Sequence, residues 1–170
     1  AQIIWDRVVL QKYIIEDDRV NVNSTQIVYV RLEYDYDNQP LTSATVTLNG
    51  MFTGSTYNGV YKAIEVPVTN DTIGVECYRL TSFIDNLYGL TELHVNASPP
   101  CIIWDAIIVT SGRVSDDRAD IKSVQKMFFK LEYAYDGAPF NDSGGRKVYI
   151  AGEEATYSTS EWYIEITSPV

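Results

Sequence analysis

The chain has 170 residues, 45% of them hydrophobic, and it carries a formal net charge of −10 with a sequence pI near 4.4. This negative charge repels phosphate backbones and no basic run offsets it, so the composition disfavours nucleic-acid binding. Apolar stretches such as Cys101 to Trp104 are far shorter than the roughly 20 residues that cross a bilayer, which predicts no membrane span.

An internal repeat organises the chain. The string Ile3-Ile4-Trp5-Asp6 returns as Ile102-Ile103-Trp104-Asp105, and Asp17-Asp18-Arg19 returns as Asp116-Asp117-Arg118, each 99 positions after its first copy. Because this period matches the length of a small domain, it predicts two copies of one fold.

The repeat also predicts where the two copies divide. We expect a first domain at residues 1–98, a linker at 99–101 and a second domain at 102–170. The linker follows from Pro99 and Pro100, because proline lacks the amide donor that a central strand needs.

A long strand is predicted at Val28 to Asp37, where apolar and polar residues alternate. A period of two with one polar face is typical of an antiparallel strand that covers a core. The second copy shows the same alternation, which supports the prediction independently. The residues expected to point inward are Val28, Val30, Leu32, Tyr34 and Tyr36 in the first copy and Met127, Phe129, Leu131, Tyr133 and Tyr135 in the second.

Further strands are expected in both copies. Strands about ten residues apart, joined by Asn, Gly, Asp and Pro turns, predict two tandem immunoglobulin-like antiparallel β-sandwich domains with little helix. These strands are Ala44–Leu48 and its counterpart Lys147–Ile150, then Gly59–Val68 with Val60, Ile64, Val66 and Val68 inward, its counterpart with Trp162, Ile164 and Ile166 inward, and finally Thr72–Leu80 and Tyr88–Val95.

The second copy is shorter than the first. Nothing in it corresponds to residues 69–100, so the second domain is expected to lack its last strands. A sheet that is short of strands exposes unpaired backbone groups and invites a neighbouring chain to add a strand.

A period does not reveal where a repeat unit begins. If Ile102 to Val109 closes the first sandwich, then Ile3 to Leu10 is a closing strand without a domain of its own, and it would insert into the incomplete second domain of the adjacent subunit. A head-to-tail contact of this kind produces a filament when it does not close. The candidates for this strand, within residues 1–10, are Ile3, Ile4, Trp5, Val8 and Leu10.

Three motifs recur in the units: Ile-Trp-Asp at the start, Asp-Asp-Arg ahead of the long strand, and Leu-Glu-Tyr-x-Tyr-Asp-x-x-Pro followed by Val-x-x-x-Gly. Repeats with these motifs resemble the tandem Ig-like modules of archaeal cell-surface and secreted proteins. The resemblance implies an extracellular structural or adhesive role and carries no catalytic residues. Because members are often longer strings of units, the chain is alternatively a fragment of a longer multi-repeat surface protein, or its second domain is a small variant sandwich.

Four Asn-x-Ser/Thr triplets, mostly beside predicted turns, are candidates for N-glycosylation: Asn23, Asn70, Asn96 and Asn141. Such triplets also arise by chance, but four of them favour a glycoprotein that carries glycans on asparagine. A chain that starts at Ala1 fits a mature secreted protein as well as a trimmed one. We therefore expect an extracellular location, secreted or at the cell surface.

The two cysteines, too few for a disulfide-scaffolded fold, leave two alternatives open. Cys77 alternates with Ile73 and Val75, as a small core residue would. In an oxidising compartment it would instead bond to Cys101 and close the first domain against the linker.

The residues indicate no catalytic or metal centre. His94 is the only histidine, so neither a histidine cluster for a metal nor a Ser-His-Asp set is predicted. Carboxylates at residues 17–18 and 35–37 offer oxygen ligands to calcium, but the glycine and distal glutamate of a calcium loop are absent. Turn formation explains these residues better, and we expect no cofactor.

The sequence thus predicts a non-enzymatic extracellular structural protein. We expect a subunit of a surface filament or surface layer, a homopolymer that assembles by head-to-tail β-strand complementation. The alternative is an adhesin or a carbohydrate- or protein-binding Ig-like module, which a cluster of exposed aromatic side chains on one face would indicate.

Overall fold

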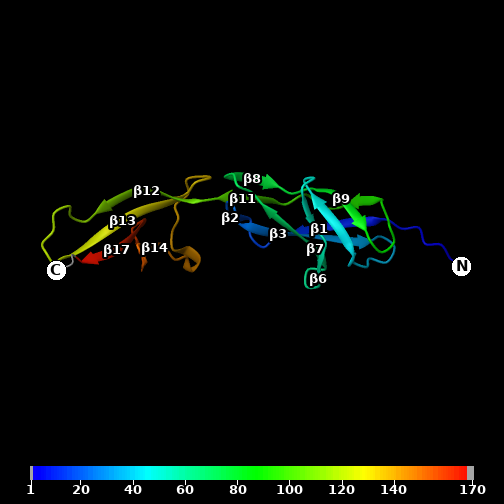
Figure 1. Cartoon of the computed structure of the whole chain (residues 1–170), viewed down its shortest axis with the longest axis horizontal. Helices are drawn as coiled ribbons and strands as arrows, with labels where there is room; N and C mark the ends of the chain where they lie inside the picture. The colour runs from blue at the N-terminus through cyan, green and yellow to red at the C-terminus, as the bar shows by residue number, and fades with distance from the viewer. Residues whose placement is uncertain (1, 168–170) are drawn as a thin grey trace. The chain divides into compact units, whose positions relative to one another are not determined.

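A computed structural model describes residues 2–167 of the chain. Within this range the protein is all-β, as predicted, and its helical content is the short 3-10 segment η1 (Ser143–Gly145). The chain divides into two compact units, Ala1–Trp104 (unit 1) and Asp105–Val170 (unit 2), each made of strands joined by turns (Figure 1).

Unit 1 contains three sheets. A five-stranded sheet has the order β10-β1-β3-β7-β6, and two three-stranded sheets have the orders β5-β4-β9 and β2-β11-β8. In the large sheet β1 pairs parallel with β10, whereas the other pairs are antiparallel. The strands are β1 (Val8–Ile14), β2 (Arg19–Asn21), β3 (Thr25–Tyr34), β4 (Ala44–Leu48), β5 (Phe52–Gly54), β6 (Thr56–Asn58), β7 (Ala63–Thr69), β8 (Gly74–Cys77), β9 (Leu80–Asp85), β10 (Leu93–Val95) and β11 (Cys101–Asp105).

One hydrophobic core joins the three sheets of unit 1. Alternate residues of each strand point into it, because successive side chains of a strand face opposite sides. The core contains seventeen buried residues, among them four of the five predicted from the first long strand: Val8, Leu10, Val20, Val28, Val30, Leu32, Tyr34, Leu41, Ala44, Val46, Leu48, Ile64, Val66, Val68, Tyr78, Ile102 and Trp104.

Four residues predicted to point inward are exposed instead: Tyr36, Tyr135, Val60 and Ile166. Tyr36 and its repeat counterpart Tyr135 lie in turns, because β3 ends at Tyr34 and the matching strand of unit 2 ends at Tyr133. Val60 is 87% exposed, since it lies in the turn between β6 and β7. For Tyr36, Tyr135 and Val60 the alternation of apolar residues extends beyond the strand, whereas Ile166 lies within β17 and is 40% exposed.

The segment before β9 also differs from its prediction. The expected strand at residues 72–80 is interrupted, and its inward face is the opposite one: Ile73, Val75 and Cys77 are exposed, whereas Tyr78 is fully buried. The expected strand at residues 88–95 is reduced to β10. The partners of this segment lie in β11, far along the chain, and its local pattern does not reveal them.

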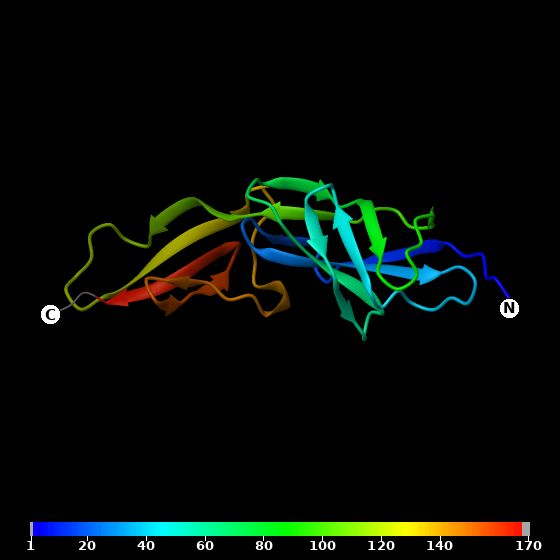
Figure 2. The ribbon, with the colours of Figure 1, turned by 45° about the vertical axis from the view of Figure 1, so that its right-hand side comes forward.

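Unit 2 has fewer strands and a smaller core. A four-stranded antiparallel sheet has the order β12-β13-β17-β16, and β14 and β15 form a separate pair (Figure 2). Four residues form its buried core: Leu131, Ala155, Trp162 and Ile164. The strands are β12 (Ile107–Val114), β13 (Val124–Tyr133), β14 (Tyr149–Ile150), β15 (Glu153–Glu154), β16 (Thr156–Ser158) and β17 (Glu161–Thr167).

Equivalent strands of the two units pair in the same register. Val8 pairs with Tyr34 as Ile107 pairs with Tyr133, and each pair of strands has a bulge at the same repeat position. Trp162, Ile164 and Ile166 take the register positions of Ile64, Val66 and Val68, because the β16–β17 turn is two residues shorter than the β6–β7 turn. Among the described residues, unit 2 has no counterpart of β8, β9, β10 or β11.

The division between the units falls inside the repeated motif. Ile102 and Trp104 belong to the core of unit 1, and unit 2 begins at Asp105. The division therefore lies three residues after the expected start of the second domain, at Ile102. It also cuts the segment 102–109, because β11 pairs within unit 1 whereas β12 pairs within unit 2.

Candidate strand-exchange site

β11 fills a groove in unit 1 with the side chains of Ile102 and Trp104, both fully buried. Its backbone pairs antiparallel with β8, and the amide of Ile103 donates to the carbonyl oxygen of Asp18 at 2.7 Å. The indole Nε1 of Trp104 donates to the hydroxyl of Tyr78 at 3.0 Å, so the one polar atom of the buried ring is satisfied. β11 is thus the closing strand of unit 1.

A disulfide holds the start of β11 in this groove. Cys101 stands opposite Cys77 in the β8–β11 pairing, and the two are bonded. The amide of Tyr78 also donates to the carbonyl oxygen of Pro100 at 2.9 Å. In the first copy of the repeat Gln2 stands in place of Cys101, so the equivalent segment has no such covalent link.

The last residue of the motif caps the unit that follows it. Asp105 is buried, and its Oδ1 accepts hydrogen bonds from the amides of Ala106 (2.8 Å) and Tyr135 (2.9 Å). Asp6 does the same in unit 1, with the amides of Arg7 (2.8 Å) and Tyr36 (3.0 Å). The motif therefore has two parts: Ile-Ile-Trp closes one unit and Asp anchors the next.

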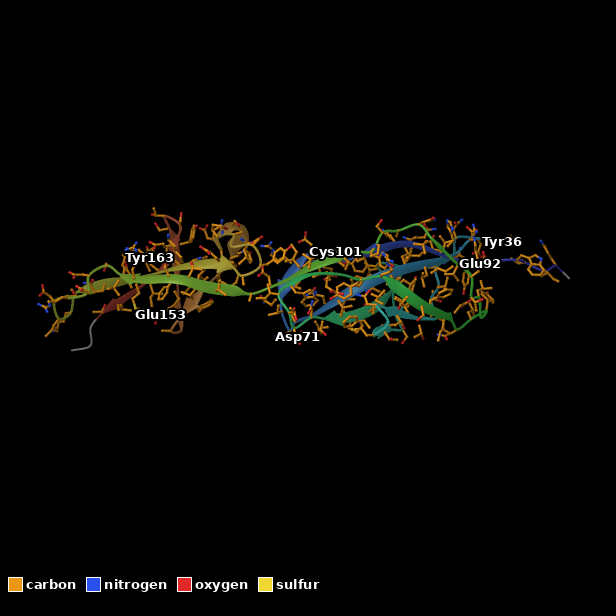
Figure 3. The ribbon with its side chains drawn as sticks, turned by 90° about the horizontal axis from the view of Figure 1, so that it is seen from above. Tyr36, Asp71, Glu92, Cys101, Glu153 and Tyr163 are labelled. Carbon is orange, nitrogen blue, oxygen red and sulfur yellow. A yellow bond between two sulfur atoms is a disulfide. The ribbon has the colours of Figure 1, made fainter. Side chains whose placement is uncertain are left out.

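The first Ile-Ile-Trp is exposed, unlike the second. Ile3, Ile4 and Trp5 are 74%, 55% and 88% exposed, and residues 2–7 form no strand. Figure 1 shows this segment in blue, leaving unit 1 without a strand beside it. It leaves at the end where Tyr36 and Glu92 lie, opposite the end that carries Cys101 (Figure 3). Trp5 lines a surface cavity there, together with Tyr36 and Glu92.

Of the five residues predicted to belong to an exchanged strand, two are buried within unit 1 and three are exposed. Val8 and Leu10 are fully buried in β1, paired with β3 and β10 of the same unit. The exposed candidates are therefore Ile3, Ile4 and Trp5. Sequence periodicity does not make this distinction, because all five residues are apolar.

The predicted glycosylation sites lie at exposed or partly exposed positions. Asn23 and Asn70 lie side by side, since the amide of Asn23 donates to the carbonyl oxygen of Asn70 at 2.8 Å. They border one cavity together with Met51 and Phe52. Asn96 follows β10, and Asn141 accepts a hydrogen bond from the amide of Ser143 at 3.1 Å.

The outer face of the unit 2 sheet carries an aromatic and cationic cluster. Phe128 and Tyr163 stand opposite each other on β13 and β17, with ring centroids 5.7 Å apart. The guanidinium of Arg113 lies 3.9 Å from the centre of the Phe128 ring, and Lys126 Nζ lies 4.3 Å from that of Tyr163. Glu161 pairs with Arg113, which raises the pKa of the arginine. Figure 3 labels Tyr163 on this unit.

The described residues were also compared with the requirements of a metal site and of a membrane-spanning helix. Among residues 2–167 no group of three or more His, Cys, Asp and Glu side chains is placed to hold a metal ion. In the same range no helix has the length and apolar character of a membrane span. The acidic residues considered for calcium serve the fold: Asp35 pairs with Arg7, and Asp37 accepts from the amide of Gln39.

Comparison with known proteins gives a distant structural likeness. No family model matches the chain, and no curated protein matches it. The chain is similar in structure to FdeC, described as a broadly conserved Escherichia coli adhesin eliciting protection against urinary tract infections, with 14% sequence identity and a TM-score of 0.39. The match covers 95% of this chain and 55% of that chain, so this chain spans about half of its length. A likeness this distant carries no argument about function.

Proposed function

We propose that the chain is a non-enzymatic extracellular surface protein, built of tandem Ig-like β-sandwiches of which the second is incomplete. Its role is structural or adhesive. Four accessible glycosylation triplets support the extracellular location, and so does the disulfide between Cys77 and Cys101, because disulfides persist in oxidising compartments.

Within this class, copies associate head to tail through the segment Ile3–Trp5, and repetition of the contact builds a filament or surface layer. One observation carries this proposal: the same Ile-Ile-Trp closes a core at residues 102–104 and is exposed at residues 3–5. Exposed apolar side chains of this size mark interaction sites, and a strand added to an open sheet satisfies its backbone groups as well. A heterologous contact that does not close extends without limit.

The strength of this contact sets the conditions of its test. Burial of three large apolar side chains supplies roughly 5–9 kcal/mol. Association costs at least about 4 kcal/mol, so about 5 kcal/mol remains at the favourable end of this range, which corresponds to a dissociation constant near 0.2 mM. Assembly should therefore appear at high protein concentration, as at a crowded cell surface.

Sedimentation velocity between about 10 μM and 1 mM tests the proposal, a range that brackets the expected constant. We expect the average mass of the native chain to rise with concentration, and the double variant Ile4→Asp/Trp5→Asp to stay monomeric and folded. Val60→Asp is the matched control, since Val60 is equally exposed but lies in a turn. A native chain that remains monomeric up to 1 mM would refute head-to-tail assembly.

A second candidate function is adhesion, and the aromatic and cationic face of unit 2 favours it. Phe128 and Tyr163 present rings at the surface of one sheet, as sugar- and protein-binding faces often do. The double variant Phe128→Ala/Tyr163→Ala should then lose binding to immobilised glycans while its assembly is unchanged. Equal glycan binding by the native chain and this variant would exclude that face.

A further inference from the structure

In unit 1 the closing strand contributes its side chains to the buried core, and we call three residues of that core, Val28, Leu48 and Val68, the floor of the groove that receives β11. Ile102 and Trp104 share their core with Val28, Leu48 and Val68, which lie on β3, β4 and β7. All five side chains are fully buried. The groove that receives β11 is therefore apolar on its floor, and its rim provides the backbone of β8 and of Asp18.

In unit 2 the counterparts of this floor are uncovered. Repeat offset and strand register place Met127, Ile150 and Ile166 at the positions of Val28, Leu48 and Val68. Ile166 is 40% exposed, and the other two are only partly buried. In addition, Gly112 takes the register position of Tyr13, a side chain that packs on the core of unit 1.

We propose that this open floor of unit 2 is the seat of Ile3–Trp5 from a second copy of the chain. The inference rests on the proposed head-to-tail assembly and names its acceptor. Ile3 and Trp5 would share a core with Met127, Ile150 and Ile166, as Ile102 and Trp104 share one with the equivalent residues of unit 1. The incoming segment has the same three side chains in the same order as β11, which is why it fits this floor.

The alternative seat, the groove of unit 1, is already occupied. β11 belongs to the same chain and is tied to β8 by the disulfide between Cys77 and Cys101. An incoming segment would have to displace a covalently held strand with identical side chains. Because the donor segment carries Gln2 instead of a cysteine, it cannot form that bond itself. The disulfide thus directs the donor to unit 2.

The backbone contact of β11 predicts the register of the exchanged strand. Ile103 donates its amide to Asp18 in unit 1. The repeat counterparts are Ile4 and Asp117, so the amide of Ile4 should meet the carbonyl oxygen of Asp117 in the second copy. Cysteines at these two positions would be close enough to bond, since paired strands bring their Cα atoms within disulfide range.

Oxidative cross-linking of two mixed single variants tests this seat. Full-length Ile4→Cys is mixed with full-length Asp117→Cys at about 0.5 mM, near the expected constant, and covalent dimers are identified by non-reducing electrophoresis and peptide mass spectrometry. Two matched mixtures serve as controls: Ile4→Cys with Asp18→Cys, the equivalent position in unit 1, and Val60→Cys with Asp117→Cys. We expect the Ile4–Asp117 pair to give about tenfold more heterodimer than either control, because docking raises the effective concentration of the two thiols.

The outcomes separate this inference from the function on which it rests. A yield equal to the controls, in a chain whose mass still rises with concentration, would overturn the seat and leave assembly standing through another surface. A dominant Ile4–Asp18 product would place the donor in unit 1 and also overturn the proposal. If the chain stays monomeric in sedimentation and cross-links no more than the controls, both proposals fail together.

Discussion

β1 and β12 occupy equivalent positions in unit 1 and unit 2. They share register and bulge, and both begin with three apolar residues. Their exposed fractions differ: Val8, Val9 and Leu10 are 0%, 2% and 0% exposed, whereas Ile107, Ile108 and Val109 are 39%, 43% and 63% exposed. β1 has β10 at its second edge and a full core on one face, and β12 has neither among the described residues. Burial is therefore decided by segments elsewhere in the chain and not by the strand itself.

Substitution of the two tryptophans of the repeated motif should give the largest difference in the free energy of unfolding between equivalent positions. Trp104→Ala removes a fully buried ring and should lower the free energy of unfolding of unit 1 by about 3–5 kcal/mol. Trp5→Ala, measured on dilute monomer, should change it by less than about 0.5 kcal/mol. Urea unfolding followed by near-UV circular dichroism measures both. Equal losses of unfolding free energy would mean that Trp5 and Trp104 are buried to the same extent in the monomer, contrary to their exposed fractions.

A smaller difference in the free energy of unfolding is expected between equivalent positions of β1 and β12. Leu10→Ala leaves a cavity in the core of unit 1 and should cost about 2–4 kcal/mol. Val109→Ala, at the equivalent position of β12, should cost less than about 0.5 kcal/mol in the monomer. Hydrogen exchange of peptides from each unit separates the two effects. If Val109→Ala proved as costly as Leu10→Ala, the edge of β12 would be covered in solution.

Part of this fold was predictable from local pattern. The alternation from Val28 to Tyr34 has the period of a strand, and both copies show it, so these core positions follow from the sequence. The pattern failed at Tyr36 and Val60, because an alternation of residue types does not mark where hydrogen bonding stops and a turn begins. The face of β8 was missed for a different reason: Tyr78 turns inward to meet Trp104, a partner 26 residues away.

The candidate site, too, was only partly predictable from the sequence. The repeated Ile-Ile-Trp-Asp left two alternatives open, one of which makes Ile3 to Leu10 a closing strand without a domain of its own, and the missing residues of the second copy predicted an open sheet. What the sequence did not show is that the motif divides between Trp and Asp, since that division depends on the hydrogen bonds of Asp105 with unit 2. It also left the pairing of Cys77 and Cys101 open, because residue types carry no distances.

The smallest expected effect is the pH dependence of the stability of unit 1, in which Tyr78 lies beside β11. Burial raises the pKa of Tyr78 from its ordinary value of 10.0 to about 12, although the hydrogen bond with Trp104 opposes the shift. Burial and the nearby Asp85 likewise raise the pKa of Tyr34. Between pH 10 and 12 the folded chain keeps a proton that the unfolded chain has lost. The stabilisation is therefore complete below pH 10 and declines as the pH rises through this window, by about 1 kcal/mol at pH 11 for Tyr78.

Urea unfolding of unit 1 at pH 9, 10, 11 and 11.5 measures this decline. Tyr78→Phe has no phenol to titrate, so its free energy of unfolding should fall less steeply over the same range, although its stability is lower throughout because Trp104 Nε1 loses its acceptor. Tyr36→Phe changes an exposed ring and should retain the native slope. Because the described part of unit 2, residues 105–167, has no counterpart of Tyr78, its own transition should not reflect this titration. A native slope in the Tyr78→Phe variant would mean that the alkaline decline originates outside the groove that β11 closes.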